Sequence, residues 1–269
     1  MPHASHKTVI NAPFERVSAL LVDKMEMPKK YVGTIQKSKI LERGEGYIVR
    51  EMYEPKPSDL VIREKIYLRK IPDGEEFVYE HMNNARYTGS FHNILKRVDG
   101  RKDQSELEYV MDWTPHPGTE EKIDPPTAQR MVMLGVNHLK ELAEHPPEVP
   151  DFVRSFYAAV DSLKPDAMAP LISDNIRFRM GSHSDVLGKG PLIELNRKVM
   201  SGWKSIQHHI IGVYREGGKT FVEAWVDYIV LDGNNYLLPF LTIFERDGDK
   251  ISNIKVFGDP SPLHHGWPT

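Results

Sequence analysis

The chain has 269 residues, more than the roughly 100–200 of a typical single domain, so two domains are expected. Apolar residues make up 40% and charged residues 27%, a balance that excludes a disordered chain, and the net charge of -3 gives no bias toward nucleic acid or anionic membranes. The absence of cysteine excludes disulfides, thiolate metal sites and cysteine nucleophiles.

The N-terminal segment and the hydropathy pattern indicate where the protein acts. The first residues lack the basic stretch followed by an apolar stretch that a secretory signal has. No segment approaches the roughly 18 apolar residues of a membrane helix. We therefore expect a cytoplasmic protein with no membrane span and no nucleic-acid partner.

The first half of the sequence predicts a short strand, a helix, a run of strands and a closing helix. The strand covers 7–10, the first helix ends near Asp23, and the closing helix runs from Pro126 to Glu144. Two-residue alternation and glycine-bearing turns predict six antiparallel strands, at about 34–42, 46–54, 60–70, 76–83, 87–97 and 105–113.

The opening segment Lys7 to Val17, KTVINAPFERV, and this order of elements resemble the SRPBCC superfamily. That superfamily includes START lipid-transfer domains, plant-pathogenesis-type allergens and polyketide aromatase/cyclases. The resemblance covers about residues 5–145. It implies an α+β helix-grip fold, in which an antiparallel sheet wraps around a long C-terminal helix and leaves an apolar cavity for a small molecule.

Several polar and aromatic side chains are expected at the cavity positions of this first domain. Tyr79, His81 and Asn83 share one face of one strand, so together they could recognise a polyoxygenated ligand. Taken singly, such residues are more often rim residues or satisfied core groups. The ligand-binding candidates are Tyr53, Tyr79, His81, Asn83, Arg86, Tyr109 and Trp113.

Three prolines within residues 146–150 predict the boundary between the domains. Proline lacks a backbone donor and favours extended chain, and helices are expected on both sides of this stretch. We therefore place a first domain at 1–145, a proline-rich linker at 146–150 and a second domain at 151–269.

The second half predicts three helices, a strand between the second and third, and a four-stranded meander. Its turns are indicated by Gly217-Gly218, by Gly233-Asn234 and by Asp247-Gly248-Asp249. The helices are expected at about 151–162, 165–172 and 191–200, and the strands at 176–180, 205–215, 219–230, 236–246 and 250–258.

Three phrases in the meander, VEAWVDY (222–228), FERDGDKI (244–251) and FGD (257–259), resemble SnoaL-like proteins of the nuclear-transport-factor-like superfamily. Ketosteroid isomerase and limonene-epoxide hydrolase belong to the same superfamily. The resemblance covers about 151–262 and implies an α+β cone, in which a curved antiparallel sheet packs on three helices around a pocket. It also implies a homodimer through the outer face of the C-terminal sheet.

A two-residue turn at Gly217-Gly218 would place His208 opposite Asp227 and His209 opposite Val226. A second turn at Gly233-Asn234 then divides the sheet into two faces. The face assigned to the interior holds His209, Ile211, Val213, Val222, Ala224, Val226, Leu241, Ile243, Ile254 and Val256. The other face holds His208, Ile210, Glu223, Trp225, Asp227, Phe240, Thr242, Phe244, Lys255 and Phe257.

Each face has a catalytic and a structural interpretation. His209, near Tyr228 in the apolar interior, could act as a general base, or it could simply bond to backbone. On the other face, His208 and Asp227 could form a dyad, but the aromatic side chains favour an interface with another subunit.

The superfamily resemblance extends the set of catalytic candidates. The strand at 176–180 carries Arg177 and Arg179 instead of the general-base aspartate of ketosteroid isomerases, which argues against that mechanism. Asp227, Arg179 and Asp259 supply the residue types of the limonene-epoxide hydrolase site. The catalytic candidates are His208, His209, Asp227, Arg179, Tyr228 and Asp259.

No metal or cofactor is expected. The pair His264-His265 lacks the separated third ligand that a zinc site needs. The leading hypothesis is an enzyme of secondary metabolism that performs cofactor-independent acid–base chemistry of the polyketide-cyclase, isomerase, dehydratase or hydrolase type on an apolar substrate. The alternative is a non-catalytic binding or carrier protein for a hydrophobic small molecule. A third possibility is an interaction module whose second domain only dimerises.

Overall fold

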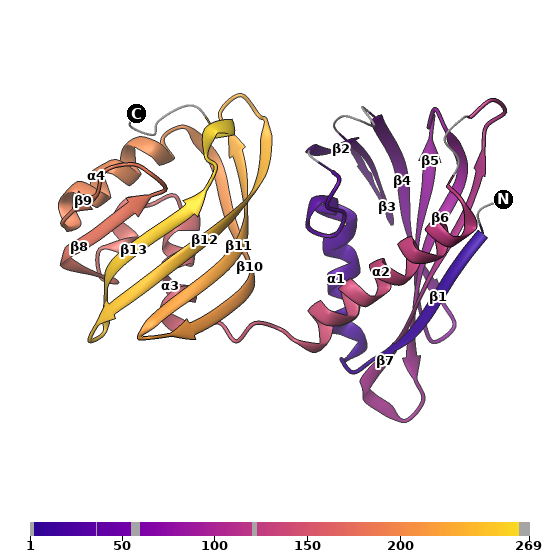
Figure 1. Cartoon of the computed structure of the whole chain (residues 1–269), viewed down its shortest axis with the longest axis horizontal. Helices are drawn as coiled ribbons and strands as arrows, with labels where there is room; N and C mark the ends of the chain where they lie inside the picture. The colour runs from indigo at the N-terminus through magenta and orange to yellow at the C-terminus, as the bar shows by residue number, and fades with distance from the viewer. Residues whose placement is uncertain (1–2, 36, 55–59, 120–122, 264–269) are drawn as a thin grey trace. The chain divides into compact units, whose positions relative to one another are not determined.

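The computed structural model describes residues 3–35, 37–54, 60–119 and 123–263 (Figure 1). The chain divides into two compact units, 1–145 and 146–269, each with its own sheet and core. His264 and His265 lie outside the described residues. Among the helices that the structure describes, none combines the length and apolar character that crossing a bilayer requires.

The described residues of the N-terminal unit form a seven-stranded antiparallel sheet and two α-helices. Its strands are ordered β1-β7-β6-β5-β4-β3-β2. The elements are β1 (His3–Ile10), α1 (Phe14–Glu26), the 3-10 helix η1 (Pro28–Lys30), β2 (Lys37–Gly44), β3 (Tyr47–Glu54), β4 (Leu60–Ile71), β5 (Gly74–Met82), β6 (Tyr87–Val98), β7 (Arg101–Pro115) and α2 (Pro125–Glu144).

Helix α2 begins and packs as its sequence predicts. The carboxylate of Asp124 accepts a hydrogen bond from the Thr127 amide (2.7 Å), which caps the helix, and prolines occupy its first positions, where no donor is needed. A stripe at three- and four-residue spacing is buried against β1 and β7: Ala128, Val132, Val136, Leu139 and Ala143. The other wall of this core includes Ile66, Phe77, Leu95 and Leu107.

The C-terminal unit is a six-stranded mixed sheet, ordered β10-β11-β12-β13-β8-β9. The elements are α3 (Asp151–Asp161), the 3-10 helix η2 (Pro165–Met168), β8 (Ile172–Met180), β9 (Val186–Leu187), α4 (Lys189–Met200), β10 (Trp203–Glu216), β11 (Lys219–Val230), β12 (Asn235–Asp247), β13 (Lys250–Gly258) and the 3-10 helix η3 (Ser261–Leu263).

Two expectations about the architecture of this unit are wrong. The sheet is not wholly antiparallel, because β8 runs parallel to β13. No hairpin turn joins these two strands, so nothing local imposes an antiparallel direction. The helix expected at 165–172 is one 3-10 turn, because Pro165 and Pro170 leave too few residues between them for an α-helix.

The register of the His208–His209 stretch of β10 against β11 is set by one correctly predicted turn and one bulge. Gly217 and Gly218 both have positive φ and pair Glu216 with Lys219, as expected of a two-residue hairpin. Between Ile210 and Gly212, however, β10 contains one extra residue. His208 therefore lies opposite Val226 and His209 opposite Trp225, so both predicted pairings, with Asp227 and with Val226, are wrong.

The next connection is also longer than a two-residue turn. Ile229 pairs with Asn235 and Asp227 with Leu237, which shifts β12 by three positions from the predicted register. An odd shift turns every side chain of a strand to the opposite face. Leu238, Phe240, Thr242 and Phe244 are therefore buried, whereas Leu241, which we expected inside, is exposed. Val222, Ala224 and Val226 of β11 are buried as predicted.

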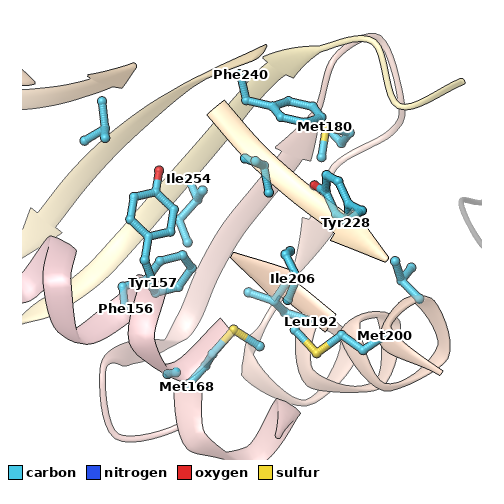
Figure 2. Close-up of a cluster of buried hydrophobic side chains, with 14 of the residues drawn as sticks. Phe156, Tyr157, Met168, Met180, Leu192, Met200, Ile206, Tyr228, Phe240 and Ile254 are labelled. Atoms are coloured by element: carbon cyan, nitrogen blue, oxygen red, sulfur yellow. The ribbon is translucent and has the colours of Figure 1, made fainter. Parts of the chain in front are cut away.

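Phe244 lies at the centre of an aromatic cluster between α3 and the sheet. Its ring is nearly perpendicular to those of Phe156 (5.3 Å between centroids), Tyr157 (5.9 Å) and Phe152 (5.9 Å). Figure 2 shows Phe156 and Tyr157 within the same buried cluster as Ile254 and Met168. Such edge-to-face contacts add to the hydrophobic gain of burial.

We predict that Phe244→Ala destabilises the C-terminal unit by about 3–5 kcal/mol, because a 1% exposed ring leaves a cavity behind. Phe257→Ala is the matched control: Phe257 lies on the neighbouring strand, is 45% exposed, and should cost about 1 kcal/mol or less. Hydrogen exchange of the β11 and β12 amides in the full chain measures both losses. Equal losses would contradict the assignment of the sheet faces.

Candidate functional site

The C-terminal unit encloses a small hollow between α3, α4 and the inner face of the sheet. Its volume is about 80 Å³, and most of its wall is aliphatic or aromatic. The polar side chains of the wall are Tyr157, Asn196, His208, Tyr228 and Thr242. Asn196 donates one amide N–H to the Leu192 carbonyl (2.9 Å), and the other polar groups of the wall include the imidazole and three hydroxyls.

His208 is held in place by the last residue of α3. Its Nδ1 lies 2.6 Å from Oδ1 of Asp161, and its backbone amide donates to Oδ2 of the same carboxylate (3.1 Å). The imidazole stacks on the Tyr157 ring, with 4.1 Å between centroids and 20° between planes. A carboxylate at Nδ1 favours the proton on that nitrogen, so the neutral ring carries its lone pair on Nε2.

Two buried tyrosines supply hydrogen-bond donors to the same hollow. Burial raises the pKa of both Tyr157 and Tyr228 well above the usual value for a phenol, and the nearby Asp161 charge raises both further. The Thr242 hydroxyl lowers the pKa of Tyr157, but the increase caused by burial is larger. Both phenols therefore stay protonated and can donate to an oxygen that becomes negative during a reaction.

The structure separates the predicted catalytic residues into two groups. His208 and Tyr228 line the hollow, whereas His209 and Asp227 alternate onto the other face of the sheet. The predicted His208–Asp227 dyad is therefore wrong, because the bulge in β10 shifts the pairing and Asp161 of α3 occupies Nδ1.

Arg179 and Asp259 also lie away from the wall of the hollow. The Arg179 side chain donates to Asp185 (2.5 Å), and Asp185 also pairs with Arg177. The Asp259 carboxylate accepts from the Ser261 amide (2.9 Å). The residue types of the limonene-epoxide hydrolase site are therefore not gathered at this hollow.

Sequence reasoning missed Asp161 and Tyr157. They are four residues apart on α3, a spacing that places both on one face of a helix, beside the apolar positions that predicted it. That spacing was the available signal. In the part of the chain that the structure describes, no three His, Asp or Glu side chains are grouped to hold a metal ion.

The N-terminal unit contains a much larger cavity, of about 890 Å³. This volume lies within the roughly 300–1,000 Å³ of small-molecule sites. Of the predicted ligand-binding residues, five line it: Tyr79, His81, Arg86, Tyr109 and Trp113. Tyr53 does not, because its neighbours Met52 and Glu54 face the cavity and strand alternation turns it away. Asn83 follows the end of β5 with φ of 55°, where alternation stops.

Several buried polar atoms of this wall have no hydrogen-bond partner within residues 3–35, 37–54, 60–119 and 123–263. They are the Tyr79 hydroxyl, both ring nitrogens of His81 and the indole nitrogen of Trp113. Burial lowers the pKa of His81, which keeps its ring neutral. The His81 and Trp113 rings are in contact, 4.8 Å between centroids. Buried polar atoms normally find partners, so these atoms indicate the polar positions of a bound molecule or of water.

A buried ion pair forms part of the same wall. Arg50 of β3 and Glu64 of β4 are paired across the strands, with 2.7 Å between Nη2 and Oε2, and Arg50 Nε also donates to that oxygen (3.1 Å). The other end of the guanidinium donates to the carbonyls of Lys24 (2.9 Å) and Met25 (2.8 Å). This pair therefore connects the sheet to α1.

Glu64→Ala should destabilise the N-terminal unit by about 3–5 kcal/mol, since it leaves a buried guanidinium without its carboxylate. The matched control is Glu51→Ala, which breaks the neighbouring Arg63–Glu51 pair on the outer face of the same two strands. Its side chains are 50% and 32% exposed, against 5% and 10% for the buried pair, so about 1 kcal/mol or less is expected. Hydrogen exchange of the β3 and β4 amides measures the loss of stability in both variants. Similar losses in the two would contradict the prediction.

The family model that describes the SnoaL-like domain matches residues 153–254 of this chain. Among the curated proteins, none matches this chain.

Several solved structures are similar to part of the chain. A candidate SnoaL-like polyketide cyclase from Jannaschia sp. is 16% identical, with 44% of this chain and 92% of that one covered and a TM-score of 0.39. A hypothetical protein with a ketosteroid-isomerase-like fold from Catenulispora acidiphila is 16% identical, with 45% and 99% covered and a TM-score of 0.41. An LEH-like epoxide hydrolase from M. tuberculosis is 18% identical, with 42% and 84% covered and a TM-score of 0.37.

Proposed function

We propose that the SnoaL-like domain at residues 153–254 performs cofactor-independent acid–base chemistry on a small apolar molecule, with His208 as the general base. One observation carries this proposal: His208 lines an apolar hollow while its Nδ1 lies 2.6 Å from the Asp161 carboxylate. An imidazole oriented in this way has its second nitrogen available for proton transfer.

The geometry supports proton abstraction next to a carbonyl group. Nε2 of His208 takes the proton from carbon, and the electron pair of the C–H bond moves onto the carbonyl oxygen. A phenol of Tyr157 or Tyr228 donates a hydrogen bond to the enolate oxygen, and Asp161 stabilises the imidazolium. The imidazolium then returns the proton to another atom. The same base serves cyclisation, isomerisation and dehydration, and by activating water it serves hydration or hydrolysis.

The size of the hollow limits what can react there. At about 80 Å³ it is well below the roughly 300–1,000 Å³ of small-molecule sites, so a polyketide-sized substrate needs its walls to move. Met168 and Met180 are both part of the wall, and methionine is unbranched and flexible. We infer that these two side chains move when substrate enters.

The test is deuterium uptake at the α-carbon of small cyclic ketones in D₂O, followed by NMR. His208→Gln should slow the enzyme-catalysed exchange by about 10²–10⁴-fold, because the base is lost. Asp161→Asn should slow it less, because the ring loses its orientation but remains. His209→Gln is the control and should leave the rate unchanged, since His209 faces away from the hollow. Wild-type exchange no faster than that of His208→Gln would contradict the proposal.

A second candidate function is supported by the 890 Å³ cavity of the N-terminal unit. Here we propose an SRPBCC-like helix-grip domain that binds a hydrophobic small molecule without transforming it. The order of its elements supports this assignment: a strand, a helix, six antiparallel strands and the long helix α2. The cavity volume and the buried polar atoms on its wall support the binding role.

The neutral fluorophore N-phenyl-1-naphthylamine should bind this cavity and brighten. Gly135→Leu should weaken its binding by about tenfold or more, because a Cβ at Gly135 already comes within 3.0 Å of the Tyr109 ring and the rest of the side chain must fill the cavity. Met133→Leu, on an exposed position of the same helix, is the control. Unchanged binding in Gly135→Leu would show that the fluorophore sits elsewhere.

We also propose a second copy of this chain as a partner, bound through the outer face of the C-terminal sheet. Leu241 and Phe257 are exposed on that face. Phe240 is buried inside and does not contribute, contrary to the expected interface. Apolar side chains on a sheet face suit an interface between identical subunits.

A further inference from the structure

Lys24 is a buried cation on the wall of the N-terminal cavity. It lies inside α1 and is only 8% exposed. Its Nζ donates to Oδ1 of Asn93 (2.8 Å). Three aromatic rings surround the same nitrogen, with centroid distances of 4.1 Å to Tyr109, 5.1 Å to Phe91 and 5.2 Å to Tyr79. Ring faces and an amide oxygen stabilise an ammonium group but do not neutralise its charge.

Across the described residues, Lys24 forms no ion pair with a carboxylate. The nearby Glu64 uses Oε2 to bind Arg50 through two nitrogens. In helix α1, Asp23 is bound by Lys30 (2.5 Å) and by the Tyr31 hydroxyl (2.6 Å). A buried charge without a counter-ion is costly, so the space beside Lys24 is an electrostatically prepared position for an anion.

The other titratable groups around Lys24 do not remove this excess of positive charge. Burial raises the pKa of Tyr79 and of Tyr109, so both phenols are neutral and can donate to an anion. Burial also disfavours the charged form of His81 and lowers its pKa, so this ring is neutral as well. Arg50 adds positive charge and Glu64 negative charge, and these two are paired with each other.

We propose that the N-terminal cavity selects an apolar, largely aromatic ligand that carries one acidic group, and that the ammonium of Lys24 is the counter-ion of that group. A carboxylate, a phenolate or an enolate meets this description. The contacting rings of His81, Trp113 and Tyr87, with 4.8 Å and 5.8 Å between centroids, provide flat apolar surface for the remainder of such a molecule. This inference deepens the proposed binding function and rests on it.

Two fluorophores test the inference on the full chain, because they share a scaffold and differ in charge. 1-Anilinonaphthalene-8-sulfonate is an anion, and N-phenyl-1-naphthylamine lacks the sulfonate. The measured quantity is the ratio of their dissociation constants. Lys24→Met should shift that ratio against the anion by about tenfold or more, since charge-assisted contacts are the stronger ones, and the ratio cancels any change in cavity shape that affects both probes alike.

The matched control is Lys65→Met. Lys65 also lies over aromatic rings, Tyr47 at 4.2 Å and Tyr67 at 5.1 Å, but it does not line the cavity. Its substitution should leave the ratio unchanged. An equal ratio in wild type and Lys24→Met would overturn the role of Lys24 alone. Failure of the neutral probe to bind wild type would overturn the binding function, and the inference with it.

The pH dependence of wild type provides a test that needs no variant. Burial and Arg50 lower the pKa of Lys24 to about 7, against the opposite effect of Glu64, and a bound anion must raise it again. Affinity for the anionic probe is therefore highest below about pH 7. It should fall about tenfold or more between about pH 6 and about pH 9, while the neutral probe shows no change. Anion binding that is independent of pH over this range would overturn the proposal.

Discussion

Both candidate sites depend on strand parity, the alternation by which successive side chains of a β-strand point to opposite faces of the sheet. Helices cover one face of each sheet, so only alternate residues of a strand can reach the hollow. In the N-terminal unit, parity turns the Arg50–Glu64 pair inward and the adjacent Glu51–Arg63 pair outward. In the C-terminal unit, the extra residue in β10 turns His208 inward beside Val226. A shift of one position would exchange His208 for His209.

The two hollows combine apolar walls with different charged groups. The small one has a carboxylate–imidazole pair, Asp161 and His208, which suits proton transfer. The large one has an ammonium group, Lys24, whose neighbours are rings and an amide, which suits holding an anion. Apolar walls lower the local dielectric constant, so each charge acts more strongly there than at the surface. Each unit can therefore have its own chemistry.

Local signals in the sequence were sufficient for most of the elements but not for their register. Helix α2 and the Gly217-Gly218 hairpin were predicted from apolar periodicity and turn residues, which act over a few positions. The bulge beside Gly212 has only a weak signal, a glycine inside a strand, which does not show which residue is the extra one. Asp161 lies 47 residues before His208, and their contact depends on how α3 packs on the sheet. In the sequence, Lys24 is one polar position of an amphipathic helix. Only the structure shows that a cavity lies beside it.

The proposed chemistry requires that Asp161 orients the His208 ring so that Nε2 remains the base. Long-range ¹H–¹⁵N NMR of the histidine side chains, with His208 assigned by its loss in His208→Gln, reads this directly at a pH where the ring is neutral. We predict the proton on Nδ1, with Nε2 unprotonated, and loss of that preference in Asp161→Asn. A proton found on Nε2 in the wild-type protein would contradict it.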